Sequence, residues 1–432
     1  MEKLVYSDNS NACNSTCYYS TYHRAMARRI VVSNRIVERV RVAVEGLWII
    51  DVRYNGIRLG KLVKIIIVQS IIFFMGAIMN LDDLARFKQL DTQNMLGEID
   101  NLPDQLGYAY QLGLKHQLPD WTGFRQVVIA GMGGSAIGAD LLASYCASLA
   151  PLPVSVHRDY GLPLYARGEE TLVICSSHSG NTEETLEAFE AARNAACRIV
   201  VVCTGGKLAK LGKEYNLPVW TFDHAGQPRA AVGFSFGLLL AMFQRLGFIP
   251  DQKAAVEDAL AAMKKSQEHI KADVPAAHNP AKRYAGQLMG RWVTVMGSGL
   301  LTTVARRWKG QLNEVAKAGA NFEFLPEANH NTLAGTVNPE EVLNPHTMTL
   351  FLRAPSDHPR NRLRTDLTKQ AFMLEGMNTD VADARGETPL AHMWTLILFG
   401  DYMAYYLAMG YGVDPTPIQA LIAFKQAMTE AK

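Results

Sequence analysis

The chain has 432 residues, of which 48% are hydrophobic and 19% charged, and its formal net charge is +2. This is the composition of an ordinary globular protein, and the length is enough for about two to three domains with a sizeable buried core. Arginine gathers before Lys64 and the remainder of the chain is mildly acidic, so the sequence predicts no nucleic-acid partner.

Residues 1–78 differ in composition from everything that follows them. They lead into an apolar run of about fifteen residues, 65–79, which Gln69 and Ser70 interrupt. A bilayer span needs roughly 20 apolar residues, and a secretory signal would lie much nearer the start of the chain. We therefore interpret 1–78 as an atypical extension, non-native or disordered, with the natural start at Met79. A membrane-associating helix, a targeting segment and an accessory domain are the alternatives.

After Met79 the pattern becomes regular. An opening helical segment is predicted over 81–112, with a break at Pro103. Short β-rich runs then alternate with amphipathic helical stretches, which is typical of a parallel sheet with helices on both faces. The expected strands of this first unit are 126–130, 154–157, 172–176, 199–203 and 219–222. Each is followed by a turn or a helical pattern, as βαβ connections require.

A polar helix predicted over 251–272, with the prolines after it, marks a domain boundary. The second unit again begins with a strand, a glycine turn and a helix, at 292–299, so it resembles a diverged copy of the first. Its other strands are expected at 322–325, 348–352 and 379–382, and two closing helices at 393–407 and 417–429.

Two loops that follow expected strands are rich in small and hydroxylated residues. The first is Gly131-Met132-Gly133-Gly134-Ser135, and the second runs from Ser176 to Thr185. Amides and hydroxyls at a helix N-terminus form a cradle for an anion. A nicotinamide site would need an acidic residue at the end of the following strand, where this chain has His157 and Arg158. An ordinary helix cap is the simpler alternative, although a cap needs one hydroxyl and the second loop offers several.

These loops and several later segments resemble sugar isomerase (SIS) domains and, among them, the bifunctional phosphoglucose/phosphomannose isomerases. The similarity runs from about Met79 to the C-terminus. Matching segments are G-M-G-G-S at 131–135, S-x-S-G-N-T-x-E-T at 177–185, and those at 228–235, 309–314, 325–331 and 411–417. The resemblance implies an α/β fold of two SIS domains, each a parallel β-sheet flanked by helices (flavodoxin-like, three-layer α/β/α). It places SIS domain 1 at 79–250, a linking helix and loop at 251–280, and SIS domain 2 at 281–432.

The same resemblance implies roles for residues in these motifs. Aldose–ketose isomerisation moves one proton between C1 and C2 through a cis-enediol, which needs a carboxylate base, a cation for the oxyanion and groups that open the ring. The implied catalytic residues are Glu314 as the base, Arg229 as the cation, His330 for ring opening, and Lys425 for ring opening or a substrate hydroxyl. The implied phosphate-binding residues are Ser135, Ser177, Ser179 and Thr182, with Gly133 and Gly134 as weaker substrate contacts.

Each of these residues also has a simpler interpretation. A charged residue on a helix is usually solvated, a loop histidine is more often a surface hydrogen-bonding residue, and Arg229 could lie on the surface at a helix N-terminus. The chain also departs from the family pattern at His178, Val315 and Thr332, where tyrosine, asparagine and an acidic residue are common.

The expected substrate is a phosphorylated hexose: glucose 6-phosphate and also mannose 6-phosphate, with fructose 6-phosphate as the shared ketose. We expect no metal and no cofactor, because H-x-H and H-E-x-x-H motifs are missing and side chains can transfer the proton. Such SIS domains usually pair, so the resemblance implies a homodimer, in which His330 acts either in its own site or in that of the neighbouring subunit.

Cysteines beside apolar runs are typical of a reducing compartment, so we expect a cytoplasmic protein whose core makes no membrane contact. The alternative functions are a non-catalytic sugar-phosphate-binding SIS regulator and another SIS-domain phosphosugar isomerase. A pure sensor would not need Glu314, His330 and Arg229 together.

Overall fold

The computed structural model describes residues 37–43, 49–54, 57–58 and 80–431. The chain forms two compact units, Met1–Ala77 and Ile78–Lys432. In the first unit, β1 (Val37–Ala43), β2 (Ile49–Tyr54) and β3 (Ile57–Arg58) form an antiparallel sheet. The apolar run 65–79 lies outside the described residues, and a natural start at Met79 stays a prediction.

Three helices open the second unit: α3 (Leu84–Leu90), α4 (Met95–Asp100) and α5 (Leu102–Lys115). Pro103 lies in the first turn of α5, where its missing N–H costs no intrahelical bond, so it begins this helix instead of breaking one. The chain turns earlier, at Asp91, whose carboxylate accepts hydrogen bonds from the N–H groups of Met95 and Leu96 at 2.7 and 2.9 Å. The predicted single helical segment is therefore three short helices.

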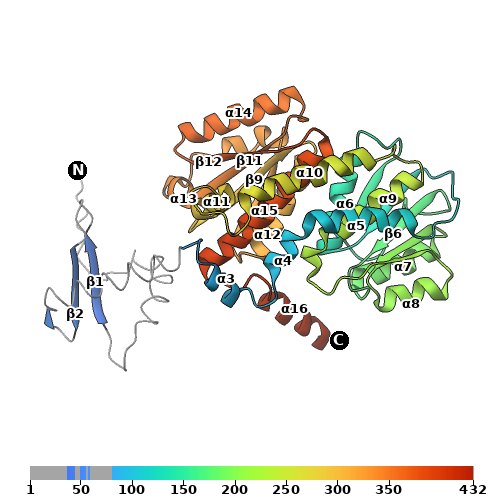
Figure 1. The fold of residues 1–432 in the computed structure, drawn as a ribbon, viewed down its shortest axis with the longest axis horizontal. Coiled ribbons are helices and arrows are strands. Elements are labelled where there is room, and N and C mark those ends of the chain that lie inside the picture. Colours follow the sequence, from blue (N-terminus) through green and yellow to red (C-terminus); the bar gives the residue numbers. More distant parts are fainter. Residues whose placement is uncertain (1–36, 44–48, 55–56, 59–79, 432) are drawn as a thin grey trace, which may run out of the picture. The chain divides into compact units, whose positions relative to one another are not determined.

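The first parallel sheet, the one that contains β6 in Figure 1, has the strand order β5-β4-β6-β7-β8. Its strands are β4 (Gln126–Ala130), β5 (Val154–His157), β6 (Thr171–Ser176), β7 (Arg198–Cys203) and β8 (Val219–Thr221). The accompanying helices are α6 (Gly133–Cys146), α7 (Glu183–Asn194), α8 (Gly206–Glu214) and α9 (Val232–Arg245). Every residue of β6 is buried, which explains why its sequence is a continuous run and does not alternate. All five strands lie where the sequence predicts them.

The second parallel sheet has the order β10-β9-β11-β12. Its strands are β9 (Trp292–Ser298), β10 (Ala320–Leu325), β11 (Thr347–Arg353) and β12 (Asn378–Asp383). The helices of this half are α10 (Lys253–Ile270), α11 (Pro280–Leu288), α12 (Leu301–Glu314), α13 (Glu340–His346), α14 (Pro359–Leu374), α15 (Pro389–Tyr411) and α16 (Gln419–Glu430). Three short 3-10 helices lie in loops: η1 (Pro228–Ala230), η2 (Glu327–His330) and η3 (Thr332–Ala334). Two parallel sheets flanked by helices confirm the predicted α/β class.

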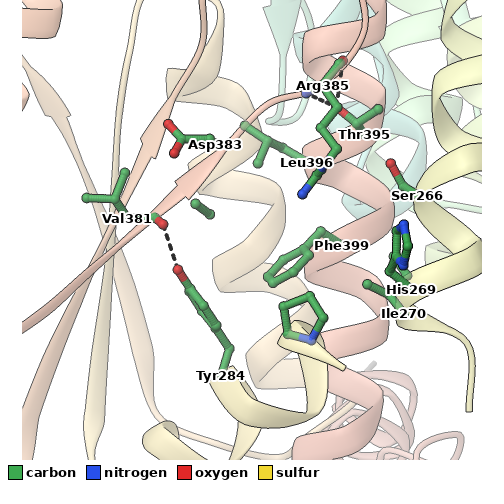
Figure 2. Close-up of a pocket in the computed structure, with 12 residues that line it drawn as sticks. Ser266, His269, Ile270, Tyr284, Val381, Asp383, Arg385, Thr395, Leu396 and Phe399 are labelled. Atoms are coloured by element: carbon green, nitrogen blue, oxygen red, sulfur yellow. Dashed lines mark hydrogen bonds between the residues drawn. The ribbon is translucent and has the colours of Figure 1, made fainter. Parts of the chain in front are cut away.

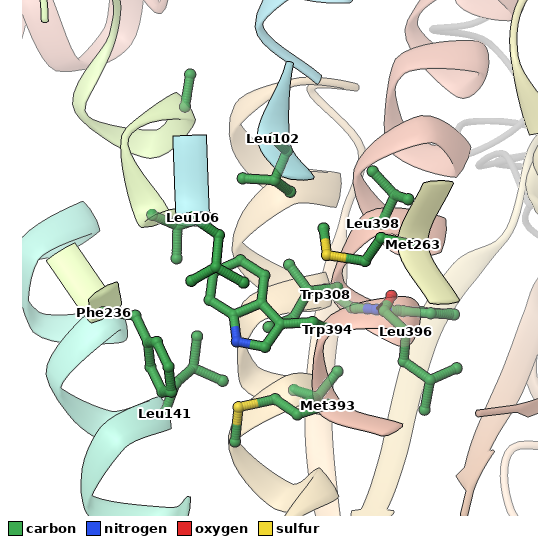
Figure 3. Close-up of a cluster of buried hydrophobic side chains, with 14 of the residues drawn as sticks. Leu102, Leu106, Leu141, Phe236, Met263, Trp308, Met393, Trp394, Leu396 and Leu398 are labelled. Atoms are coloured by element: carbon green, nitrogen blue, oxygen red, sulfur yellow. Dashed lines mark hydrogen bonds between the residues drawn. The ribbon is translucent and has the colours of Figure 1, made fainter. Parts of the chain in front are cut away.

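One hydrophobic core joins the helices of both sheets. Figure 3 shows Leu102 and Leu106 of α5, Phe236 of α9, Trp308 of α12 and Trp394 of α15 in this cluster. The rings of Phe236 and Trp394 meet edge to face, with centroids 5.2 Å apart. A Cβ at Gly400 would lie 2.2 Å from the Trp308 indole nitrogen, so glycine lets α12 approach α15 closely. The two sheets are therefore parts of one packed body, and the loops between them have fixed places.

The sequence offers a membrane-associating helix as one alternative for the segment before Met79, and the apolar run of that segment lies outside the described residues. No helix within the described ranges combines the length and apolarity that a bilayer span requires.

Candidate active site

The hydroxyl-rich loop joins the end of β6 to the start of α7. Ser177 Oγ lies 2.9 Å from Thr182 Oγ1 and accepts a hydrogen bond from the Gly180 N–H at 3.2 Å. Thr182 is the N-cap residue of α7 by position, but its side chain makes no capping hydrogen bond. The ordinary helix-cap interpretation therefore does not account for this hydroxyl, which faces Ser177 across the loop.

Glycine is required where this loop turns. Gly180 has a φ of 65°, and a Cβ there would lie 1.9 Å from the carbonyl oxygen of Gly205. Ser179 Oγ accepts from the Asn181 N–H at 3.3 Å, and the Asn181 side chain accepts from the Lys207 N–H at 3.0 Å. The loop after β6 is thus tied to the loop after β7, at the carboxyl edge of the sheet where α/β folds bind ligands.

The glycine turn after β4 lies against both the hydroxyl loop and η1. Ser135, in the first turn of α6, accepts a hydrogen bond from the His178 N–H at 3.1 Å. Gly133 has a φ of 51°, and a Cβ on Gly134 would lie 2.4 Å from the carbonyl oxygen of Pro228. The predicted phosphate-binding residues are therefore next to the segment that carries Arg229.

Arg229 and Glu314 come from different halves of the unit and meet. Arg229 Nη1 lies 3.9 Å from Glu314 Oε2, and the two side chains are 5% and 37% exposed. Arg229 Nη2 also donates to the carbonyl oxygens of Pro415, at 3.0 Å, and Thr416. Burial lowers the pKa of Arg229, while the neighbouring Glu314 raises it. A rigidly held cation therefore faces a partly exposed carboxylate at the last residue of α12.

The backbone of Arg229 contacts a buried ion pair. Arg307 Nη2 donates to Asp401 Oδ2 and to the backbone carbonyl of Arg229, both at 2.8 Å. The side chains of Arg307 and Asp401 are 3% and 4% exposed. Asp414 lies nearby and accepts from Thr92 Oγ1 at 2.6 Å and from the Thr416 N–H at 2.9 Å. None of these contacts was predicted from the sequence, although Asp414 lies within the matching segment 411–417.

A histidine chain lies beside the hydroxyl loop. His178 Nε2 is 2.9 Å from His224 Nδ1, and His224 Nε2 is 3.2 Å from Glu98 Oε2. If the carboxylate of Glu98 accepts, His224 Nδ1 is free to accept from His178 Nε2–H, so all three groups can be satisfied with both rings neutral. Burial, and then the neighbouring His224, lower the pKa of His178 to about 4. The sequence showed His178 only as a departure from the family pattern.

The structure does not bring His330 and Lys425 to Glu314. His330 is the last residue of η2 and is exposed, and Lys425 is exposed on α16. Within the described part of the chain, neither side chain forms a hydrogen bond or ion pair with Glu314 or Arg229. Their catalytic roles stay predictions.

A cavity of about 210 Å³ lies elsewhere, between α10, α11, β12 and α15. Figure 2 shows Tyr284 of α11 at its side, donating a hydrogen bond to the Val381 carbonyl at 2.6 Å. None of the predicted site residues lines this cavity. Within the described residues, no group of three or more His, Cys, Asp or Glu side chains is placed to hold a metal ion.

Comparisons with known proteins identify the family. Residues 277–428 match the family described as "Bacterial phospho-glucose isomerase C-terminal SIS domain". A bifunctional phosphoglucose/phosphomannose isomerase of Caldicellulosiruptor bescii is 38% identical over 342 residues, which is 78% of this chain and 100% of that protein. The enzyme of the same name from Aquifex aeolicus is 31% identical over 74% of this chain and 96% of its own length.

Solved structures agree in fold. A hypothetical protein of Thermus thermophilus superposes with a TM-score of 0.62 at 16% identity, covering 80% of this chain and 92% of that one. A glucose-6-phosphate isomerase-like protein of the same organism gives 0.55 at 20% identity, over 79% and 99%. The predicted fold and the predicted resemblance are both confirmed, and the chain belongs to the bifunctional phosphoglucose/phosphomannose isomerase family.

Proposed function

We propose that the protein interconverts glucose 6-phosphate and mannose 6-phosphate with fructose 6-phosphate through a cis-enediol. The observation that carries this proposal is the approach of Glu314 Oε2 to Arg229 Nη1, 3.9 Å, beside the glycine turn that bears Ser135. A carboxylate next to a buried guanidinium suits a reaction that moves a proton between two carbons while negative charge develops on the adjacent oxygens.

In the proposed reaction Glu314 removes the proton from C2 of the open-chain aldose. The electron pair forms the C1–C2 double bond and the carbonyl electrons move onto O1, where Arg229 stabilises the charge. The hydroxyl proton of O2 is transferred to O1, the C2 carbonyl forms, and Glu314 returns the abstracted proton to C1. Arg229 suits this role because three backbone contacts immobilise it: it donates to the carbonyls of Pro415 and Thr416, and its own carbonyl accepts from Arg307. A preorganised charge costs no reorganisation when the reaction occurs.

Ser135, Ser177, Ser179 and Thr182 hold the phosphate in this proposal. Their loop adjoins η1 through the contact between Gly134 and Pro228, so a substrate anchored there extends towards Arg229 and Glu314. The family resemblance alone assigns ring opening to His330, and either ring opening or the binding of a substrate hydroxyl to Lys425. The SIS domains are proposed at 79–250 and 281–432. The first domain then contains the hydroxyl-rich loop that binds the phosphate, and the second contains the base, Glu314.

The test is a coupled assay of the full chain on glucose 6-phosphate and mannose 6-phosphate, with and without a chelator. We expect formation of fructose 6-phosphate from both sugars at a rate that the chelator does not change. Activity on neither sugar, with retained phosphosugar binding, would favour a non-catalytic SIS regulator and reject the proposal. The matched variant is Glu314→Gln, which keeps the shape of the side chain and removes its basicity.

We also propose that the protein is a homodimer in the cytoplasm. The helix α16 has no buried residue, and its large apolar side chains are exposed: Leu421 (46%), Ile422 (56%), Phe424 (62%) and Met428 (46%). Apolar side chains gathered on one short helix favour a protein partner, and a second copy would cover them. The described cysteines are free, as in a reducing compartment. Light scattering of the wild type and of Phe424→Glu tests the dimer, which should dissociate in the variant.

A further inference from the structure

Lys317 lies three residues beyond Glu314, just after the end of α12. Its Nζ donates hydrogen bonds to the backbone carbonyls of Glu314 and Val315, at 3.0 and 3.3 Å. Its φ is 54°, a left-handed conformation that is unfavourable for a residue with a Cβ atom. Ala196 and Asn216, which follow α7 and α8, have the same φ, so this conformation ends helices elsewhere in the chain and is not by itself a sign of function.

The ammonium group of Lys317 shares its surroundings with the candidate catalytic residues. The charged groups that face it are Arg229 of η1, Glu314 of α12 and Asp414 of the segment after α15. Loss of solvation and repulsion from Arg229 lower the pKa of Lys317 to about 8, although both carboxylates oppose the shift. Its charge therefore changes within the pH range in which enzymes are assayed.

A simpler role would be a helix cap, because lysine side chains often bind the last carbonyls of a helix. A cap alone does not require a second cation beside a buried guanidinium. Arg307 is neutralised by Asp401, so the cations that face the proposed base, Glu314, are Arg229 and Lys317. Two cations beside one carboxylate base suit a reaction in which negative charge develops on the substrate.

We propose that Lys317 is a positioning residue for the isomerisation, because its ammonium group fixes the last turn of α12, which carries Glu314, and adds positive charge beside Arg229. This inference rests on the proposed function. Lys317 acts through Glu314 and takes no proton from the substrate. In its protonated form it donates to the carbonyls of Glu314 and Val315 and adds positive charge beside Arg229, whereas the neutral amine carries no charge.

The experiment compares pH profiles of kcat and KM for the full chain, Lys317→Arg and Lys317→Met on glucose 6-phosphate. In the wild type, kcat should fall above about pH 8 and level off near the rate of Lys317→Met, because the neutral amine supplies no charge beside Arg229. Lys317→Arg should restore most activity and move this alkaline limb upward by at least about one pH unit, because arginine stays protonated. Lys317→Met should lose roughly 10- to 100-fold in kcat, lack the limb and keep KM within about twofold.

The control is Lys265→Met, which removes an exposed lysine of α10 and should leave the profile unchanged. Circular dichroism of each variant checks folding, and if Lys317→Met is unfolded, Lys317→Arg still tests the shift of the limb. An active wild type with the same alkaline limb in Lys317→Arg would overturn the inference and leave the proposed function standing. A wild type inactive on both hexose phosphates would overturn both.

Discussion

The buried ion pair between Arg307 and Asp401 should control both the stability of the protein and the placement of Arg229. Asp401→Leu removes one partner of a 2.8 Å contact whose side chains are 3% and 4% exposed. An unpaired guanidinium at that depth costs about 3–5 kcal/mol. Changing Arg307→Met as well removes both charges and leaves the Arg229 carbonyl without its donor, which costs about 1–3 kcal/mol. The double variant should therefore be more stable than Asp401→Leu by about 2 kcal/mol.

Thermal and urea unfolding of the single and double variants measure these differences, and kcat on glucose 6-phosphate is followed in parallel. Stability should recover in the double variant while activity does not, because the backbone carbonyl of Arg229 then lacks the hydrogen bond from Arg307. The control is Asp104→Leu, which breaks an exposed pair with Lys264 and should cost less than about 1 kcal/mol. If the two single changes simply add in the double variant, the reasoning about a coupled pair is refuted.

Three further outcomes are expected. Glu314→Gln should lower kcat about 10²- to 10⁴-fold with KM nearly unchanged, whereas Glu268→Gln on the exposed face of α10 should have no effect in the same assay. Ser177→Ala removes the partner of Thr182 and of the Gly180 N–H, so it should raise KM more than it lowers kcat, and equal changes in both would contradict a binding role. Burial lowers the pKa of His178 from 6.5 to about 4, so the unfolded chain binds the extra proton between these values. Stability should therefore fall as the pH drops from about 6.5 to about 4, and His178→Asn should flatten this decline in a series of melting curves.

The strands and the phosphate loop could be predicted because their signals are local. The run at 172–176 is apolar almost throughout, and the hydroxyls and glycine that follow it are contiguous in the sequence. Such a segment carries its own evidence for a strand, a turn and a helix start. The predicted helix break at Pro103 was wrong, because Pro103 lies in the first turn of α5. Proline both ends helices and begins them, and the sequence alone does not say which.

The contacts that hold the candidate catalytic residues in place could not be predicted, because they join residues that are far apart in the sequence. Arg307 and Asp401 are separated by 94 positions, and Glu98 and His224 by 126. Each of these residues, taken singly, fits an ordinary solvated position on a helix or loop. Only packing of the helices shows that Arg307 points to Arg229. Conversely, the sequence assigns His330 and Lys425 to the site from the family resemblance, yet both side chains are exposed in this single chain.

The contacts of Arg229 with Pro415 and Thr416 also have a meaning for biosynthesis. During translation residue 229 leaves the ribosome long before residues 415 and 416, so its guanidinium has no permanent backbone acceptors until nearly the whole polypeptide has emerged. The surroundings of Arg229 are therefore completed only when the final segment of the chain has been synthesised.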